Sequence, residues 1–389
     1  MTALRGKPAR RLATLMIAPL ALAGGLTSAA PAVASAAGCI AVTGLPMPAD
    51  PQGLDQVLNG AAVLGACDAW AVGATGGSNT VNQTLTEHYD GSGWTIVPSP
   101  NAGQSGDANV LTAVAAVSAG NVWAVGLTSH NSTTQTLIEH WNGTSWTVEQ
   151  TGLPGGGTTS LSAVTATSAT GIWAVGRTGG TNGQPLIEHY DGHGWTAANG
   201  VSIPAGNIDG FLSGVTATSA TDAWAVGTTM TSNFAKQTLV ERWNGTNWTV
   251  APSANPGSAT TANQLTGVVA LTPSNAWAVG STTSGSSQAL IEHWNGRAWT
   301  QAAIPAIGTS SGLNGIAASS DRNIWAAGSY GDSNGSHTLA EQFDGNNWNV
   351  IPSPDGGQVN ELFGSGTSSA TSTWLVGVAD GHPLAINCC

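Results

Sequence analysis

The residues with the clearest potential for chemistry are Glu-His pairs that recur along the chain. The pairs are Glu87-His88, Glu139-His140, Glu188-His189 and Glu292-His293, with Glu241-Arg242 and Glu341-Gln342 in two further copies. A carboxylate beside an imidazole could hold a metal ion or act in acid–base catalysis. However, the pairs lie in segments typical of β-strands, where neighbouring side chains point to opposite faces. We therefore expect each Glu to be a buried, hydrogen-bonded part of the framework, and we predict no catalytic residue, no metal site and no cofactor.

These pairs belong to a repeat that fills most of the chain. Seven Trp residues, spaced 48 to 53 residues apart, open segments that resemble Trp-Ala-Val-Gly: Trp70, Trp123, Trp173, Trp224, Trp277, Trp325 and Trp374. In the second copy the pattern predicts strands at 111–118, 121–128, 136–142 and 145–149. An Asn-Gly or Asp-Gly dipeptide links the last two strands and indicates a tight hairpin flanked by an aromatic pair. Such units predict an all-β, seven-bladed β-propeller with four-stranded antiparallel blades.

The two ends of the repeat region complement each other. The seventh copy stops after Pro-Leu-Ala-Ile-Asn (383–387) and lacks a last strand, whereas residues 39–48 resemble a last strand without the other three. We expect the N-terminal strand to complete the last blade. Cys39 would then face Cys388 at the aromatic pair position, and Cys67 with Cys389 would form a second disulfide. A bond between the adjacent Cys388 and Cys389 is the alternative.

The repeat resembles the Kelch motif and, more broadly, the galactose-oxidase type of propeller. The matching residues are Trp-Ala-Val-Gly (123–126), Trp141-Asn142-Gly143 and Trp146 with their copies, and the resemblance covers 39–389. Gly126 is followed by Leu127 instead of the second Gly of Kelch repeats, and the turn also resembles the Asp-box of sialidase-type propellers. The resemblance implies a fold and no particular activity, because such propellers serve as scaffolds, binding modules and enzymes.

The N-terminal segment has the order of a secretory signal peptide. Basic residues precede an apolar stretch at 12–26, and a small-residue region ends at Ala36. We predict a signal peptide over 1–36 and a single propeller domain over 37–389, in a secreted, extracellular protein of bacterial type. A lipoprotein anchored at Cys39 is the alternative, and both the general secretory and the twin-arginine route remain open.

The charge of the mature chain excludes some partners. Five Lys and Arg residues follow residue 36, against 21 Asp and Glu, so the formal charge is near −16. We therefore expect no nucleic acid partner, and no membrane insertion because no later stretch is long and apolar enough. We expect the domain to be a monomer.

Candidate binding residues lie in loops that vary between the repeats. The loops joining the second strand to the third, and one blade to the next, share one face of the expected propeller, and variable loops on a rigid scaffold commonly carry function. Two clusters stand out there: Asp209, Phe211, Phe234 and Lys236 in the fourth repeat, and Tyr330, Asp332 and His337 in the sixth.

Two classes of function fit this pattern. The first is a non-catalytic module that recognises an extracellular polysaccharide, cell-wall component or protein through this face. The alternative is a glycan-active lyase or hydrolase, which needs two carboxyl groups about 5–10 Å apart; Asp209 with Asp332 or Glu361 are its candidates. A structural protein of the cell surface is a third possibility.

Overall fold

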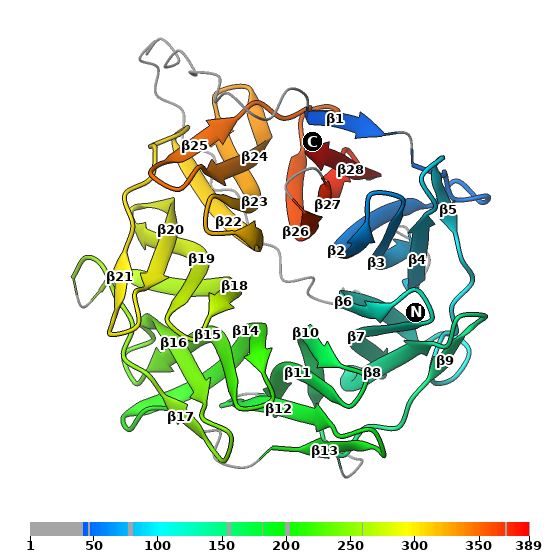
Figure 1. The fold of residues 1–389 in the computed structure, drawn as a ribbon, viewed down its shortest axis with the longest axis horizontal. Coiled ribbons are helices and arrows are strands. Elements are labelled where there is room, and N and C mark those ends of the chain that lie inside the picture. Colours follow the sequence, from blue (N-terminus) through cyan, green and yellow to red (C-terminus); the bar gives the residue numbers. More distant parts are fainter. Residues whose placement is uncertain are drawn as a thin grey trace, which may run out of the picture. The chain divides into compact units, whose positions relative to one another are not determined.

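Alternating strands and tight turns make up the described chain, which contains 28 strands and no helix. The computed structural model describes residues 42–45, 47–76, 81–153, 157–180, 182–198, 203–258, 260–369 and 372–388. The strands form seven four-stranded antiparallel sheets. Figure 1 shows these sheets side by side in a ring, so the predicted seven-bladed β-propeller is confirmed.

Each blade runs outward from an innermost strand. The innermost strands are β2 (Asp55–Gly65), β6 (Ala108–Ser118), β10 (Thr159–Ser168), β14 (Asn207–Ser219), β18 (Ala262–Thr272), β22 (Ser310–Ser320) and β26 (Asn360–Ser369). The second strands are β3 (Asp68–Gly76), β7 (Asn121–His130), β11 (Gly171–Thr178), β15 (Asp222–Thr231), β19 (Asn275–Ser284), β23 (Asn323–Asp332) and β27 (Ser372–Ala379).

The outer half of each blade is shorter. The third strands are β4 (Gln83–Tyr89), β8 (Thr133–Trp141), β12 (Gln184–Tyr190), β16 (Lys236–Trp243), β20 (Ser286–Trp294), β24 (Gly335–Phe343) and β28 (His382–Cys388). The outermost strands are β5 (Trp94–Ile96), β9 (Trp146–Val148), β13 (Trp195–Ala197), β17 (Trp248–Val250), β21 (Trp299–Gln301), β25 (Trp348–Ile351) and β1 (Val42–Leu45).

The N-terminal strand closes the ring as predicted. β1 pairs antiparallel with β28, so the seventh sheet has the order β1-β28-β27-β26. The register differs from our expectation in one respect, because Val42 stands opposite Cys388 where we expected Cys39. Val42 thus occupies the place of the outer Trp of the other blades, and Cys39 precedes it by three residues. Cys39 and Cys389 lie outside the described residues, so both disulfides remain predictions.

The hairpin between the two outer strands follows its Asn-Gly or Asp-Gly dipeptide. Gly143 has a φ of 91°, and the Asn142 side-chain oxygen accepts hydrogen bonds from the backbone N–H groups of Thr144 and Ser145. The turn places Trp141 opposite Trp146, with ring centroids 6.0 Å apart. The expected cross-strand aromatic pair is therefore present.

The core lies between neighbouring blades and is built from these aromatic residues. Trp70 of the first blade is 2% exposed, and its ring centroid lies 5.0 Å from that of Trp141 and 5.3 Å from that of Trp146 in the second. The same triad recurs between most neighbouring blades. Between the sixth and seventh blades, Trp325 instead packs in an apolar cluster with Cys388, because the seventh blade carries no aromatic pair.

Candidate functional site

The structure separates the two members of every Glu-His pair. Trp123 is opposite His140 and Ala124 is opposite Glu139, so imidazole and carboxyl lie on different faces of the blade. His140 stacks on Trp123 at 4.1 Å, and its Nε2 lies 3.0 Å from the Oδ1 of Asn121. Burial lowers the pKa of His140, which fits a neutral ring within the framework.

The glutamates form a buried set that faces the preceding blade. Glu139 is 0% exposed, and Leu137 on the same face packs in a cluster with Trp70. Six blades carry such a residue: Glu87, Glu139, Glu188, Glu241, Glu292 and Glu341. Our expectation that each would be fixed by hydrogen bonds is wrong for four of them within the described residues. In the described part of the chain, Glu188 and Glu292 alone among the six accept a backbone N–H, from Gly152 at 3.4 Å and Ala254 at 3.2 Å.

Burial in this apolar layer controls the protonation of the six carboxyls. Desolvation raises the pKa of Glu139 from 4.5 to about 8, and that of Glu188 to about 7 because Gly152 partly compensates. In the seventh blade Ile386 takes the same register position and is also fully buried. An aliphatic side chain is therefore compatible with the site, and the glutamates belong to the framework instead of a reaction centre.

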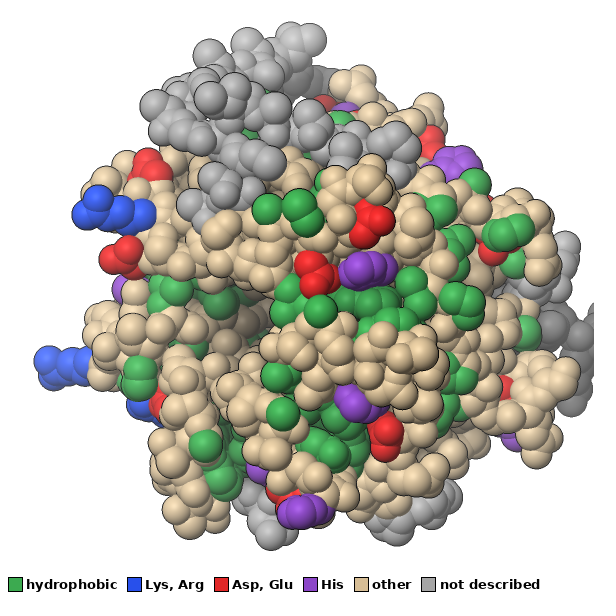
Figure 2. All heavy atoms as spheres, turned by 45° about the vertical axis from the view of Figure 1, so that its right-hand side comes forward, with side chains coloured by type: hydrophobic (Ala, Val, Ile, Leu, Met, Phe, Trp, Pro, Cys, Tyr) green, Lys and Arg blue, Asp and Glu red, His purple; other side chains and the backbone are tan. Residues whose placement is uncertain are grey.

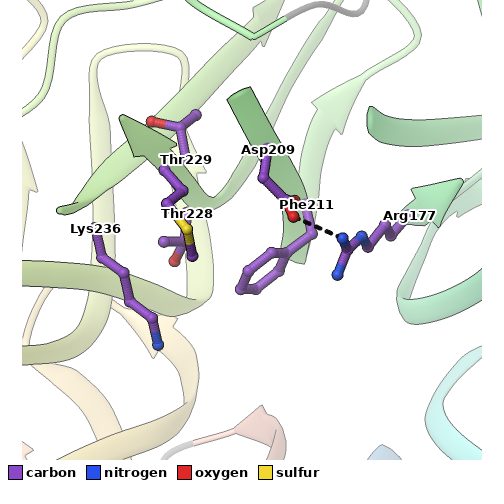
Figure 3. A pocket seen from close by; sticks show the side chains of 7 residues that line it. Arg177, Asp209, Phe211, Thr228, Thr229 and Lys236 are labelled. Atoms are coloured by element: carbon purple, nitrogen blue, oxygen red, sulfur yellow. Dashed lines mark hydrogen bonds and ion pairs between the residues drawn. The ribbon is translucent and has the colours of Figure 1, made fainter. Parts of the chain in front are cut away.

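The loop face brings most of the predicted fourth-blade cluster together. Asp209 and Phe211 lie on β14 and Lys236 begins β16, and together with Arg177 from β11 of the third blade they line a hollow of about 60 Å³ (Figure 3). The Nη2 of Arg177 donates to the Oδ2 of Asp209 at 2.7 Å. The sequence pattern missed this role of Arg177, since its partner is 32 residues away and on another blade.

Phe234 differs from the rest of this cluster. It stands at the tip of the β15–β16 hairpin, is 74% exposed and has a φ of 62°. The left-handed region is strained for a bulky side chain, so an exposed Phe in this conformation is unusual. It does not line the hollow, but it lies two residues from Lys236, which does.

The predicted sixth-blade cluster is a hydrogen-bonded assembly. Tyr330 stacks on His337 with ring centroids 4.9 Å apart, and the Nε2 of His337 lies 3.0 Å from the Oδ1 of Asp332. The Nδ1 of His337 lies 2.8 Å from the Oδ2 of Asp355, whose Oδ1 accepts the backbone N–H of Thr338. Asp355 comes from the loop that leads to the seventh blade and was not among the predicted residues. Both nitrogens of His337 are therefore occupied, and the imidazole ties two loops together.

The hydrogen bonds of His337 to Asp332 and Asp355 are expected to weaken as the pH rises. The hydrogen bond to Asp355, followed by that to Asp332, raises the pKa of His337 above 6.5 against the opposing effect of burial. The contribution of the protonated ring is thus complete below pH 6.5 and is lost as the pH rises through the raised value. We expect amide hydrogen exchange in 353–358 to accelerate, after correction for intrinsic rates, as the pH rises above the ordinary histidine pKa of 6.5.

The substitution His337→Gln provides the comparison. It should abolish the pH-dependent part of the change in 353–358 and leave the corresponding loop of the fourth blade, 251–258, unaffected. The same pH response in the variant would show that His337 does not hold the loop.

A third ionisable pair occupies the second blade. The Nδ1 of His130 lies 2.5 Å from the Oδ1 of Asp107, and the backbone N–H of Gln104, followed by His130, lowers the pKa of Asp107. Asp107 also lines an open hollow of about 320 Å³ whose other lining residues are uncharged. The spacing of Asp107 and His130 in the sequence gives no indication that they meet.

The carboxylates that an enzyme would need lie on separate blades. Asp209 is in the fourth, Asp332 in the sixth and Glu361 in the seventh, and each already has a hydrogen-bond partner. Among the described residues, no three His, Cys, Asp or Glu side chains are arranged to hold a metal ion. In that part of the chain no helix could cross a membrane. In Figure 2 the described surface consists mainly of backbone and of side chains that are neither ionisable nor hydrophobic, with hydrophobic and ionisable side chains scattered among them.

Comparisons with known proteins identify the fold alone. No protein-family model matches the chain, and no curated protein does. The structure of YCF48 bound to a D1 peptide has a TM-score of 0.54 at 14% identity, covering 94% of this chain and 100% of that one. A protein of unknown function from Dyadobacter fermentans DSM 18053 has a TM-score of 0.53 at 10% identity, with coverages of 91% and 100%. The Hadza microbial sialidase Hz136 has a TM-score of 0.50 at 9% identity, with coverages of 80% and 73%.

Proposed function

We propose that this protein is an exported, non-catalytic binding module that recognises an extracellular glycan, cell-wall component or protein through its loop face. The observation that carries the proposal is Phe234, an exposed aromatic side chain held in a strained conformation. It lies two residues along the chain from Lys236, which lines the hollow with Arg177 and Asp209. Strain of this kind concentrates at functional sites, and exposed aromatic residues are common centres of binding surfaces.

The location of the ionisable residues supports the same proposal. The framework residues recur in at least six of the seven blades, whereas the Arg177–Asp209 and His337–Asp355 pairs each occur once and lie at the loop end of the strands. A rigid ring with individual loops is an architecture suited to recognition. Propellers of similar fold include YCF48, whose structure contains a bound peptide. A Kelch-like origin of the repeat and export by the N-terminal segment are parts of this proposal.

A binding array tests the function directly. We expect the mature chain, residues 37–389, to bind a subset of glycans or cell-wall fractions, and Phe234→Asn to weaken that binding about tenfold. Asn removes the aromatic ring and tolerates the left-handed conformation, so the hairpin should keep its shape. Arg297→Ala changes an exposed turn between β20 and β21, on the opposite face, and should bind like the wild type. Turnover of a bound glycan, or equal binding by the Phe234 variant, would contradict the proposal.

A further inference from the structure

Positive charge is scarce on this protein, and two of its cations line the same hollow. Of the five Lys and Arg residues after residue 36, Arg297 and Arg322 are exposed on turns of the face opposite the loops. Arg242 is engaged by Asp222 and stacks over Trp224. The remaining two cations, Arg177 and Lys236, both line the hollow between the third and fourth blades.

The charge in this hollow is only partly neutralised. Asp209 is paired with Arg177 at 2.7 Å, whereas Lys236 forms no ion pair with any described residue. One Asp against two cations leaves a net charge of +1. Gly183 makes room for the guanidinium, since a Cβ at that position would lie 2.0 Å from the Nε of Arg177. Arg177 is therefore held in place, whereas the Lys236 ammonium remains available to a ligand.

The uncharged residues that line the hollow offer an aromatic surface and a hydroxyl group. Figure 3 shows the ring of Phe211 between the Arg177–Asp209 pair and the Lys236 side chain. Thr228 lines the hollow at 2% exposure, and its hydroxyl has no hydrogen-bond partner among the described residues. A buried hydroxyl without a partner costs free energy, which a bound ligand could recover.

The volume of the hollow and the net charge of the mature chain restrict which ligands can bind. The hollow has a volume of about 60 Å³, whereas enclosing a benzene ring takes about 150 Å³. It can therefore admit one small group, with the rest of the ligand lying outside against Phe211. The formal charge near −16 on the mature chain disfavours polyanions, so a single isolated carboxylate suits the site better than an acidic polymer.

We propose that this hollow binds the carboxylate of a uronic-acid residue in an otherwise neutral glycan. The carboxylate pairs with Lys236 and Arg177, a sugar hydroxyl meets Thr228, and the apolar face of the ring lies on Phe211. This assignment rests on the proposed function and specifies its ligand. A glycan is favoured over a peptide because the same hollow is lined by cations, an aromatic ring and a hydroxyl without a described partner.

Titration by ligand-observed NMR with three small probes tests the assignment. Methyl β-glucuronide should bind the mature protein about tenfold more tightly than methyl β-glucoside, which lacks the carboxylate, and more tightly than N-acetylalanine, which carries a carboxylate without a sugar. Lys236→Met should remove the preference for the glucuronide, and Lys236→Arg should restore most of it. Gly183→Ala should also reduce the preference, since it displaces Arg177 without altering any charge.

Three results would overturn the assignment: equal binding of glucuronide and glucoside, tighter binding of N-acetylalanine, or an unchanged preference in Lys236→Met. Thermal unfolding of each variant shows whether a loss of binding reflects a loss of fold. Failure here would be distinct from failure of the proposed function. If array binding still depends on Phe234 while Lys236 has no effect, the binding module stands and only the uronic-acid ligand is rejected.

Discussion

Replacing Glu139 by Gln is expected to raise the free energy of unfolding by about 2–4 kcal/mol at pH 9 and to change it little at pH 4.5. The cause is burial, which raises the pKa of this carboxyl from 4.5 to about 8 in the folded chain. The protonated carboxyl therefore favours folding below pH 4.5, and this contribution is lost as the pH rises through about 8. A Gln side chain has nearly the same shape and does not ionise, so it avoids the cost at high pH.

Urea denaturation at the two pH values measures this effect. Glu149→Gln is the matched control in the same blade, because the Glu149 side chain is 37% exposed, and it should leave stability within about 0.5 kcal/mol at both values. Equal destabilisation of the Glu139 variant at pH 4.5 and pH 9 would contradict the prediction. It would show that the carboxylate itself is stabilised at this position.

The same argument extends to the whole ring. Burial raises the pKa of all six framework glutamates to about 7 or 8. Because these sites lie on different blades, their effects should be roughly additive. The wild-type protein should therefore lose stability steadily from mildly acidic to alkaline pH. Ile386 shows how the seventh blade avoids this dependence, with an aliphatic residue in the equivalent position.

The repeat explains why so much of the fold could be predicted. The Trp spacing, the Asn-Gly turns and the incomplete seventh copy are local features, and together they define the blades and their closure by β1. The error at Cys388 arose from a short segment without an aromatic marker. Without such a marker, the run Cys39-Ile40-Ala41-Val42 is apolar at every position, so the sequence could not fix which of its residues stands opposite Cys388.

The candidate site was less predictable because its contacts cross between blades and loops. Phe211 and Lys236 could be grouped from their positions in one repeat, but Arg177 and Asp355 approach their partners only after the ring and its loops have formed. The hydrogen bonding of the glutamates failed as a prediction for a related reason. Whether a loop N–H reaches the carboxyl depends on the path of each inter-blade loop, and these loops have different sequences.

The largest expected loss of stability comes from Gly126→Ala. Gly126 ends the Trp-Ala-Val-Gly segment opposite Leu111, next to a bulge in β6. A Cβ added at Gly126 would lie 2.0 Å from the backbone oxygen of Val110 and 2.9 Å from the Cα of Leu111. Both atoms belong to the backbone of the adjacent strand, so a rotamer change cannot relieve the overlap. We expect a loss of about 2–4 kcal/mol in the free energy of unfolding.

Gly120→Ala is the matched control for this prediction because it lies in the turn before the same strand. A Cβ there would meet only the Cα of Gly143, at an ordinary 3.7 Å, so stability should change by less than about 0.5 kcal/mol. Thermal or urea unfolding of both variants measures the difference in stability. Equal stability of the two would contradict the predicted overlap of a Cβ at position 126 with the backbone of β6. Because every copy of this Gly, from Gly73 to Gly377, faces a backbone oxygen at 1.8–2.0 Å, the argument applies to each blade. The glycine of the repeat is thus required by the bulge in the innermost strand, and it is independent of any ligand the loops bind.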